Sequence, residues 1–335
     1  MHIHLKTLGC RLNEAEIESW ADKFQEKGHH LTSDPKNADL LVVNTCAVTQ
    51  EAVKKSRKIL RRIHRHNPRA KLVVSGCYST LDKNIADELS GVDLIIDNKD
   101  KEKLVDISLK ELNLEAMPNL SIEPNETSLF IRGRNRAFIK IQDGCRHRCT
   151  FCIVTIARGN EQSRKISEIT NEINKYYQKG IQEVVLTGVH IGGYGNDIDS
   201  NLHVLIQAIL NDTDIPRIRL ASLEPWDLHE KFFSLFANKR LMPHMHLPLQ
   251  SGSDSVLKRM ARRCKTKDFK KLVNEARNQI DNFNVTTDII VGFPGETNDE
   301  WIDSIEFIKQ IGFSHIHIFT YSKRTGTKAS MFDKQ

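Results

Sequence analysis

The sequence predicts an α/β protein in two parts, a doubly wound parallel-sheet domain followed by a partial barrel of six βα units. Short apolar runs alternate with helix-length amphipathic segments along most of the 335 residues. The alternation loosens once, between residues 101 and 134, where proline and asparagine gather. We therefore expect domains at residues 1–100 and 135–335, joined by a linker at 101–134.

In the first domain, strand-like and helix-like segments follow one another. In order they span residues 2–8, 14–27, 39–45, 52–66, 71–76 and 82–89. In the second domain, six short strands are expected at residues 137–142, 183–187, 217–222, 244–250, 286–291 and 315–321. Helices are expected between them at residues 167–179, 201–211, 227–238, 267–279 and 298–310. Six βα units are fewer than the eight of a closed barrel.

Composition and charge limit the classes of function. The chain has no basic, then apolar, leader and no window of about 18 uncharged apolar residues, so we expect a soluble cytoplasmic protein without a membrane partner. We expect no stable protein partner either. The net charge of +6 permits nucleic-acid binding without requiring it. Seven cysteines in a reducing compartment are more often metal ligands or catalysts than disulfides.

Three cysteines lie within eight residues, directly after the first expected strand of the second domain. They are Cys145, Cys149 and Cys152. A four-iron cluster takes four ligands, so three thiolates leave one iron open to a non-protein ligand. The alternative is a zinc site with His147 as fourth ligand, but zinc knuckles generally pair two short thiol hairpins, which this segment lacks.

Three further cysteines, Cys10, Cys46 and Cys77, each follow an apolar run by one to three residues. If these runs are neighbouring parallel strands, the three thiols meet at the carboxyl edge of one sheet, where such folds bind ligands. The alternative is that each is a small buried residue at a strand end. The residues alone leave both interpretations open. We interpret Cys264, which has no cysteine nearby, as an ordinary thiol.

The spacing of Cys145, Cys149 and Cys152 resembles the signature of radical S-adenosylmethionine enzymes. Other segments along essentially the whole chain resemble the methylthiotransferases within that superfamily. These segments are Gly9–Asn13, Asn44–Thr49, Gly76–Cys77, Asp143–Cys145, Ala157–Gly159, Leu186–Gly188, Leu247–Ser253 and Asp288–Glu296. Residues 9–16 and 48–52 are most similar to the branch that acts on N6-threonylcarbamoyladenosine beside the anticodon.

The resemblance implies two [4Fe-4S] clusters, one on Cys145, Cys149 and Cys152 and one on Cys10, Cys46 and Cys77. It also implies S-adenosylmethionine, bound near Phe151, Thr187, Gly188, Ser222, Glu224, Gln250, Ile290 and Gly292. Turn and strand-end roles are the alternative for several of these residues. Arg158 is expected to bind a carboxylate or phosphate, or else to be a solvated loop charge.

The implied activity is transfer of a methylthio group to carbon 2 of the modified adenosine of tRNA. One S-adenosylmethionine supplies the methyl group and a second supplies a 5′-deoxyadenosyl radical, with electrons from a donor such as flavodoxin or ferredoxin. The alternatives are a relative acting on isopentenyladenosine or on a ribosomal protein, or an inactive iron–sulfur RNA-binding module. Family members carry a further carboxyl-terminal RNA-binding barrel, which the chain is expected to lack.

Residues 52–71 contain nine cationic residues and no acid, a pattern that suits phosphate neutralisation on a helix. The alternative is a solvated helix face. The expected RNA-binding residues are Lys54, Lys55, Arg57, Lys58, Arg61, Arg62 and Arg65.

Overall fold

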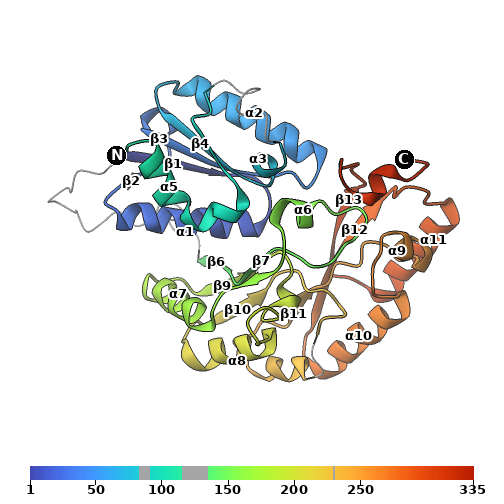
Figure 1. The fold of residues 1–335 in the computed structure, drawn as a ribbon. Coiled ribbons are helices and arrows are strands. Elements are labelled where there is room, and N and C mark those ends of the chain that lie inside the picture. Colours follow the sequence, from blue (N-terminus) through green and yellow to red (C-terminus); the bar gives the residue numbers. More distant parts are fainter. Residues whose placement is uncertain (83–90, 115–134, 229–230) are drawn as a thin grey trace. The chain divides into compact units, whose positions relative to one another are not determined.

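The computed structural model describes residues 1–82, 91–114, 135–228 and 231–335 (Figure 1). It divides into two compact units. Unit 1 comprises Met1–Phe138 and Ile156–Gly159, and unit 2 comprises Ile139–Thr155 and Asn160–Gln335. Most of the expected segment at 82–89 and of the expected linker lies outside the described residues.

Unit 1 contains a parallel five-stranded sheet in the order β2-β1-β3-β4-β5. The strands are β1 (His2–Thr7), β2 (His30–Leu31), β3 (Leu40–Thr45), β4 (Lys71–Gly76) and β5 (Leu94–Ile96). The chain turns to one side of β1 for β2 and to the other for β3. This reversal makes the β1/β3 boundary a topological switch point, where doubly wound folds bind ligands.

Helices cover both faces of this sheet, because alternate side chains of a strand point to opposite faces. On β3, Leu41 and Val43 join a cluster with Leu60 and Ile63 of α2 (Gln50–His66). Leu40 and Val42 join the opposite cluster, which contains residues of α1 (Arg11–Glu26) and α5 (Leu104–Glu111). Both faces of β3 are therefore core, and the expected doubly wound arrangement is confirmed.

Short elements complete unit 1. They are η1 (Pro35–Asn37), α3 (Cys77–Leu81) and η2 (Asn98–Lys103). Residues 101–111, expected to belong to a linker, form part of η2 and the helix α5. Leu104 and Val105 are buried in the α1 side of the core, so this segment packs with unit 1. The helix α5 was therefore not predicted from the sequence, in which the alternation of apolar and amphipathic segments is weak at this point.

Unit 2 has the six expected strands. They are β6 (Arg136–Lys140), β9 (Glu183–Thr187), β10 (Arg217–Leu220), β11 (His244–His246), β12 (Asn284–Val291) and β13 (His315–Thr320). They form two three-stranded sheets, β10-β9-β6 and β11-β12-β13. Isolated parallel bridges at Ile218–Leu241 and Ser222–His246 connect the two sheets. The strands thus follow one another as a partial barrel.

Helices cover the outside of these strands. They are α7 (Ile166–Gln178), α8 (Leu202–Asp212), α9 (Asp254–Arg259), α10 (Thr266–Gln279) and α11 (Asn298–Ile311). The short helix α6 (Val154–Arg158) belongs for most of its length to unit 1. Smaller elements are the hairpin β7 (Gln142–Asp143) and β8 (Gln162–Ser163), and the turns η3 (Ile191–Gly193) and η5 (Lys328–Met331). No described helix is long and apolar enough to cross a membrane.

One expected helix, at residues 227–238, is wrong for most of its length. The described part of this segment forms only a short 3-10 turn, η4 (Phe232–Ala237). Phe232 and Leu235 are buried three residues apart, a spacing that places both on one face of a 3-10 turn. Burial of these side chains therefore does not require a full α-helix here.

Gly76 supports the turn from β4 into α3. Its φ is 110° and its ψ is −176°, a conformation that is almost restricted to glycine. A Cβ atom there would lie 2.2 Å from Thr45 O. We predict that Gly76→Ala lowers the free energy of unfolding by roughly 2–4 kcal/mol. In Gly28→Ala, which has a φ of +81° and open space around the new Cβ, the loss should be about 1 kcal/mol. Denaturant unfolding of both variants measures the difference, and equal losses would contradict the steric argument.

Candidate functional site

The first three cysteines stand at the carboxyl ends of three neighbouring strands of unit 1. Cys10 follows β1 and is the N-cap of α1. Cys46 directly follows β3, and Cys77 directly follows β4 as the first residue of α3. The order β1-β3-β4 brings these ends side by side, at the switch point. The structure therefore brings the three thiols together, and we call them the unit 1 triad.

The thiols of the unit 1 triad are close enough to affect one another. A Cβ atom on Gly9 would lie 2.8 Å from Cys46 Sγ, so this sulfur rests against the backbone beside Cys10. Burial, helped by the neighbouring Cys77 and Cys10 thiols, raises the pKa of Cys46 to about 11. Loss of hydration also raises the pKa of Cys10, although this side chain reaches solvent. A cationic metal centre would instead favour the deprotonated thiolates, so its binding would release the thiol protons.

A buried ionic network adjoins the unit 1 triad. The Glu16 carboxylate accepts hydrogen bonds from Arg158 Nη1 at 2.9 Å and from Lys101 Nζ at 2.6 Å. Arg158 Nη2 also donates to Asn13 Oδ1 at 2.9 Å, and its side chain is 2% exposed. The positive charge of Arg158 lowers the pKa of Cys10 and of Cys46, against the larger effect of burial. Arg158 thus binds a carboxylate, and its alternative as a solvated loop charge is wrong.

The other three cysteines, which we call the unit 2 triad, lie in the loop after β6 and β7. The His147 N–H points at Cys145 Sγ, 3.4 Å away. Thr150 anchors the loop, since its N–H donates to Met260 O and its carbonyl accepts from the Ala329 N–H. Burial raises the pKa of Cys145 to about 11 and that of Cys152 to about 12. Burial also raises the pKa of Cys149.

A buried guanidinium lies beside the unit 2 triad. Arg262 Nη1 is 3.9 Å from Cys149 Sγ, and Arg262 Nη2 donates to Glu224 Oε2 at 2.7 Å. Its carbon Cζ lies 4.5 Å from the centre of the Trp226 ring. The side chain of Arg262 is 3% exposed. Sequence reasoning missed this residue, because it stands in a basic run that resembles a solvated surface.

Neither triad has the geometry of a mononuclear zinc site. Among the described residues, two groups of metal-type ligands have ligand atoms that all lie within 4.8 Å of one another, and neither contains a cysteine. Tetrahedral zinc bound at 2.3 Å needs sulfur atoms about 3.8 Å apart. The His147 ring is also engaged elsewhere, with Nε2 3.1 Å from His190 Nε2 and 3.3 Å from Asp227 Oδ2. In neither triad, therefore, do all three sulfur atoms lie within 4.8 Å of one another.

The residues expected to bind S-adenosylmethionine gather at the carboxyl edge of the partial barrel, apart from Phe151 in the loop of the unit 2 triad. Thr187 ends β9 and Gly188 follows it, Ser222 and Glu224 follow β10, and Gln250 follows β11. Ile290 lies in β12, one residue before its end, and Gly292 directly follows the strand. Phe151 and Ile290 pack against one apolar cluster, which contains Phe293 and Met260. A Cβ atom on Gly188 would lie 2.8 Å from Gln142 O, so the backbones approach closely there. Glu224 is already paired with Arg262.

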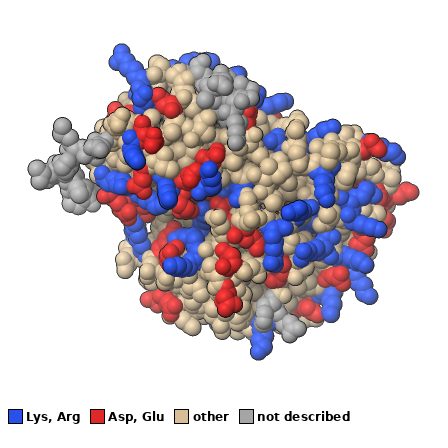
Figure 2. All heavy atoms as spheres, viewed as in Figure 1, with Lys and Arg blue, Asp and Glu red and all other residues tan. Residues whose placement is uncertain are grey.

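The expected RNA-binding residues lie on α2. Five of the seven side chains, those of Lys54, Lys58, Arg61, Arg62 and Arg65, are exposed and line one hollow together with Arg57. Lys55 is also exposed, 3.6 Å from Glu51. Arg57 differs, because its Nε donates to Tyr78 Oη at 2.6 Å and its Nη2 contacts Asp82 at 3.2 Å. On the face drawn in Figure 2, by contrast, basic and acidic side chains are interspersed over much of the surface.

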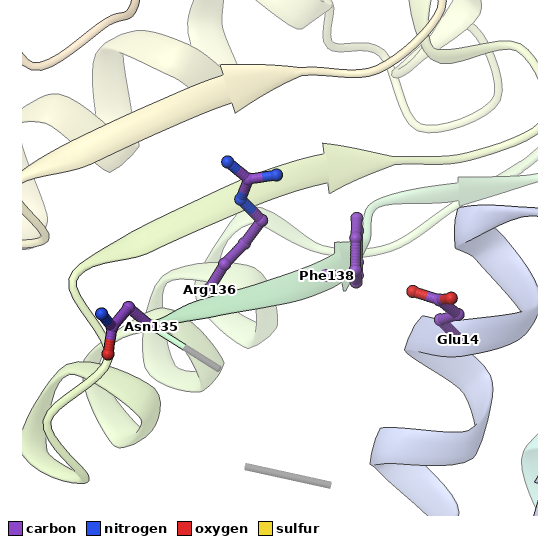
Figure 3. Close-up of a pocket in the computed structure, with 4 residues that line it drawn as sticks. All are labelled: Glu14, Asn135, Arg136 and Phe138. Carbon is purple, nitrogen blue, oxygen red and sulfur yellow. The ribbon is translucent and has the colours of Figure 1, made fainter. Parts of the chain in front are cut away.

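Unit 1 also has a shallow pocket, shown in Figure 3. It is lined by Glu14 of α1, by Asn135, and by Arg136 and Phe138 from the first part of β6, which belongs to unit 1. The lining contains none of the six triad cysteines. This pocket is therefore separate from the unit 1 triad.

Residues 139–308 match the Radical SAM superfamily, and residues 2–97 match the Uncharacterized protein family UPF0004. The chain is 36% identical to threonylcarbamoyladenosine tRNA methylthiotransferase MtaB of Thermotoga maritima, over 99% of this chain and 77% of that protein. The Bacillus subtilis protein of the same name is also 36% identical, over 98% and 75%. A tRNA-2-methylthio-N(6)-dimethylallyladenosine synthase of Staphylococcus haemolyticus is 32% identical, over 97% and 66%.

Solved structures share the fold. The radical S-adenosylmethionine methyltransferase TsrM of Kitasatospora setae, with cobalamin and a [4Fe-4S] cluster bound, matches 98% of this chain and 77% of its own. Its TM-score is 0.73 and its sequence identity 14%. The cobalamin-dependent radical enzyme OxsB matches with a TM-score of 0.63 and 12% identity, over 98% of this chain and 54% of its own.

The buried network makes Glu16 a sensitive position. We predict that Glu16→Gln lowers the free energy of unfolding by about 3–5 kcal/mol, because it leaves the cations of Lys101 and Arg158 buried without their carboxylate. Glu26→Gln, on the exposed end of the same helix, should cost less than about 0.5 kcal/mol. Urea titration of the two variants at pH 7 compares them. A loss of less than about 1 kcal/mol in Glu16→Gln would disprove the role of the carboxylate.

Proposed function

The chain belongs to the tRNA methylthiotransferase family of radical S-adenosylmethionine enzymes, and we propose that it methylthiolates carbon 2 of N6-threonylcarbamoyladenosine in tRNA. The observation that carries the proposal is the pair of three-cysteine sites, each at the carboxyl edge of its own parallel sheet system. Four relatives that are 34–36% identical bear the threonylcarbamoyladenosine name. The dimethylallyladenosine synthase cited above is 32% identical.

We infer that each triad holds one [4Fe-4S] cluster. Three thiolates leave one iron of a cubane without a protein ligand. When bound, the cluster of unit 2 with S-adenosylmethionine supplies a 5′-deoxyadenosyl radical, and the cluster of unit 1 supplies a site for the sulfur that is transferred. Loss of hydration favours the protonated thiols in both triads, so cluster binding must displace these protons.

The side chains of the protein hold the reactants in place and shield them, because the cofactors supply the difficult chemistry. Arg262 is placed to stabilise negative charge at Cys149, with Glu224 holding its guanidinium. Arg158 has the corresponding place in unit 1, held by Glu16. Phe151 and Ile290 supply an apolar wall suited to the adenine of S-adenosylmethionine. Thr187, Gly188, Ser222, Gln250 and Gly292 supply the surrounding strand ends.

The proposed activity requires two macromolecular partners, a tRNA and an electron donor. The tRNA would lie across the cationic face of α2, whose charges suit phosphate contacts. A one-electron donor such as flavodoxin or ferredoxin would reduce the cluster of unit 2. Both partners meet the protein in the cytoplasm.

A product assay tests the proposed function. The chain is reconstituted anaerobically with iron and sulfide, then incubated with S-adenosylmethionine, a reductant and tRNA carrying either N6-threonylcarbamoyladenosine or isopentenyladenosine. Nucleoside mass spectrometry should find the methylthio group on N6-threonylcarbamoyladenosine. Methylthiolation of isopentenyladenosine alone would assign the chain to the other branch. Cleavage of S-adenosylmethionine without methylthiolation of either tRNA would reject the proposed tRNA substrate.

The two triads are predicted to have separable roles. The triple variant Cys10→Ala/Cys46→Ala/Cys77→Ala should retain about four irons per chain and still form 5′-deoxyadenosine, but should make no methylthiolated nucleoside. Cys264→Ala, which removes a buried thiol outside both triads, should behave as the unaltered protein. Chromatography of the two products measures both activities. Undiminished methylthio transfer in the triple variant would disprove a role for the unit 1 triad.

The face of α2 is predicted to bind tRNA through its charge. Replacement of Lys54, Lys58, Arg61 and Arg65 by glutamine should weaken tRNA binding roughly tenfold or more at about 0.1 M salt. The slope of the logarithm of the binding constant against the logarithm of the salt concentration should become shallower by about 0.9 for each lost phosphate contact. The matched control removes four charges from α10, namely Lys267, Lys270, Lys271 and Arg277. Filter binding across a salt series distinguishes the two. Equal weakening in both variants would mean that net charge alone is responsible.

A further inference from the structure

Unit 2 brings together a second set of ligating atoms, which contains no sulfur. His147 Nε2 lies 3.1 Å from His190 Nε2 and 3.3 Å from Asp227 Oδ2, and His190 Nε2 lies 2.6 Å from the same oxygen. The exposed fractions of the three side chains are 8%, 1% and 10%. Two imidazoles and one carboxylate thus converge in a buried position.

Topology explains why these residues meet. His147 lies in the loop of the unit 2 triad, His190 follows β9 by three residues, and Asp227 lies in the segment after β10. Strands β6, β9 and β10 are neighbours in one sheet. The loops that follow them therefore share one edge. The three ligating side chains come from three different loops, so a common ligand would fasten these loops together.

The surroundings of His190 match those of a metal-bound histidine. Its Nδ1 lies 2.5 Å from Glu161 Oε1, and a carboxylate oxygen only accepts hydrogen bonds. Nδ1 therefore carries a proton, and a neutral His190 presents a lone pair at Nε2 to the Asp227 carboxylate. A proton or a metal cation must lie between these two atoms to remove the repulsion. Metal-bound histidines commonly donate their second N–H to a carboxylate in this way.

The dimensions of the group suit one small cation. An ion placed about 2.0–2.1 Å from all three atoms would lie about 1 Å out of their plane, with its remaining coordination positions on one side. The short contact between His190 and Asp227 would widen by about half an ångström or more to accommodate tetrahedral angles. Imidazole and carboxylate ligands together are typical of Zn²⁺ and of other first-row divalent ions.

We propose that His147, His190 and Asp227 bind one divalent transition-metal ion, of which Zn²⁺ is the best match, separate from both cysteine triads. The ion would connect the loop between Cys145 and Cys149 to the loops after β9 and β10, and Glu161 would orient His190. This proposal is independent of the tRNA substrate. A second group, His246, Asp288 and His317, has a similar composition, but His317 is exposed.

Zinc X-ray absorption tests the proposal on the intact protein. The chain is first reconstituted so that iron occupies the cysteine sites, its iron is counted, and it is then equilibrated with Zn²⁺ and freed of excess metal. We expect one zinc per chain, with nitrogen and oxygen neighbours at about 2.0–2.1 Å and no sulfur at 2.3 Å. Absence of stoichiometric zinc, or a sulfur neighbour, would overturn the proposal.

Variants locate the ion. Asp227→Asn and His190→Gln should each lose the zinc, or bind it at least tenfold more weakly in competition with a chelator, while their iron content verifies that the fold is retained. The matched control His317→Gln alters the other His–Asp–His group and should retain the zinc. Zinc retained in both Asp227→Asn and His190→Gln, or lost in His317→Gln, would place the ion elsewhere and reject this site.

Discussion

The three proposed metal sites in this molecule depend on one constraint, that parallel strands in a sheet end at the same edge. In unit 1 the strand order β2-β1-β3-β4-β5 makes neighbours of three strands whose next residues include Cys10, Cys46 and Cys77. In unit 2 the same geometry collects the loops after β6, β9 and β10. Residues far apart in sequence become ligands of one site without any long-range sequence pattern.

The two triads also share an electrostatic arrangement. Each has a buried arginine beside its thiols, Arg158 in unit 1 and Arg262 in unit 2, and each arginine is held by a glutamate, Glu16 or Glu224. Burial favours neutral thiols, whereas the guanidinium favours thiolates. The glutamate limits the cost of burying the arginine and fixes its position. A cluster with a net negative charge would be stabilised in such surroundings.

The features that could be predicted from the sequence are those that depend on neighbouring residues along the chain. All six strands of unit 2 could be predicted, because apolar runs are local features. The positions of Cys10, Cys46 and Cys77 after apolar runs are local features too, but their convergence depends on the strand order, which the residues alone left open. The carboxylate partner of Arg158 is 142 positions away at Glu16, and Lys101 lies in a run of charges that resembles a solvated turn. No local pattern marks such pairs. Likewise, His190 and Asp227 are ordinary loop residues until the barrel places them beside His147.

Mössbauer spectroscopy of the chain reconstituted with 57Fe tests whether both triads hold four-iron clusters. We expect about eight irons per chain, all in cubane clusters, together with 5′-deoxyadenosine formation under reduction. About four irons would mean that Cys10, Cys46 and Cys77 hold no cluster. Zinc in place of iron, without cleavage of S-adenosylmethionine, would contradict the radical chemistry altogether.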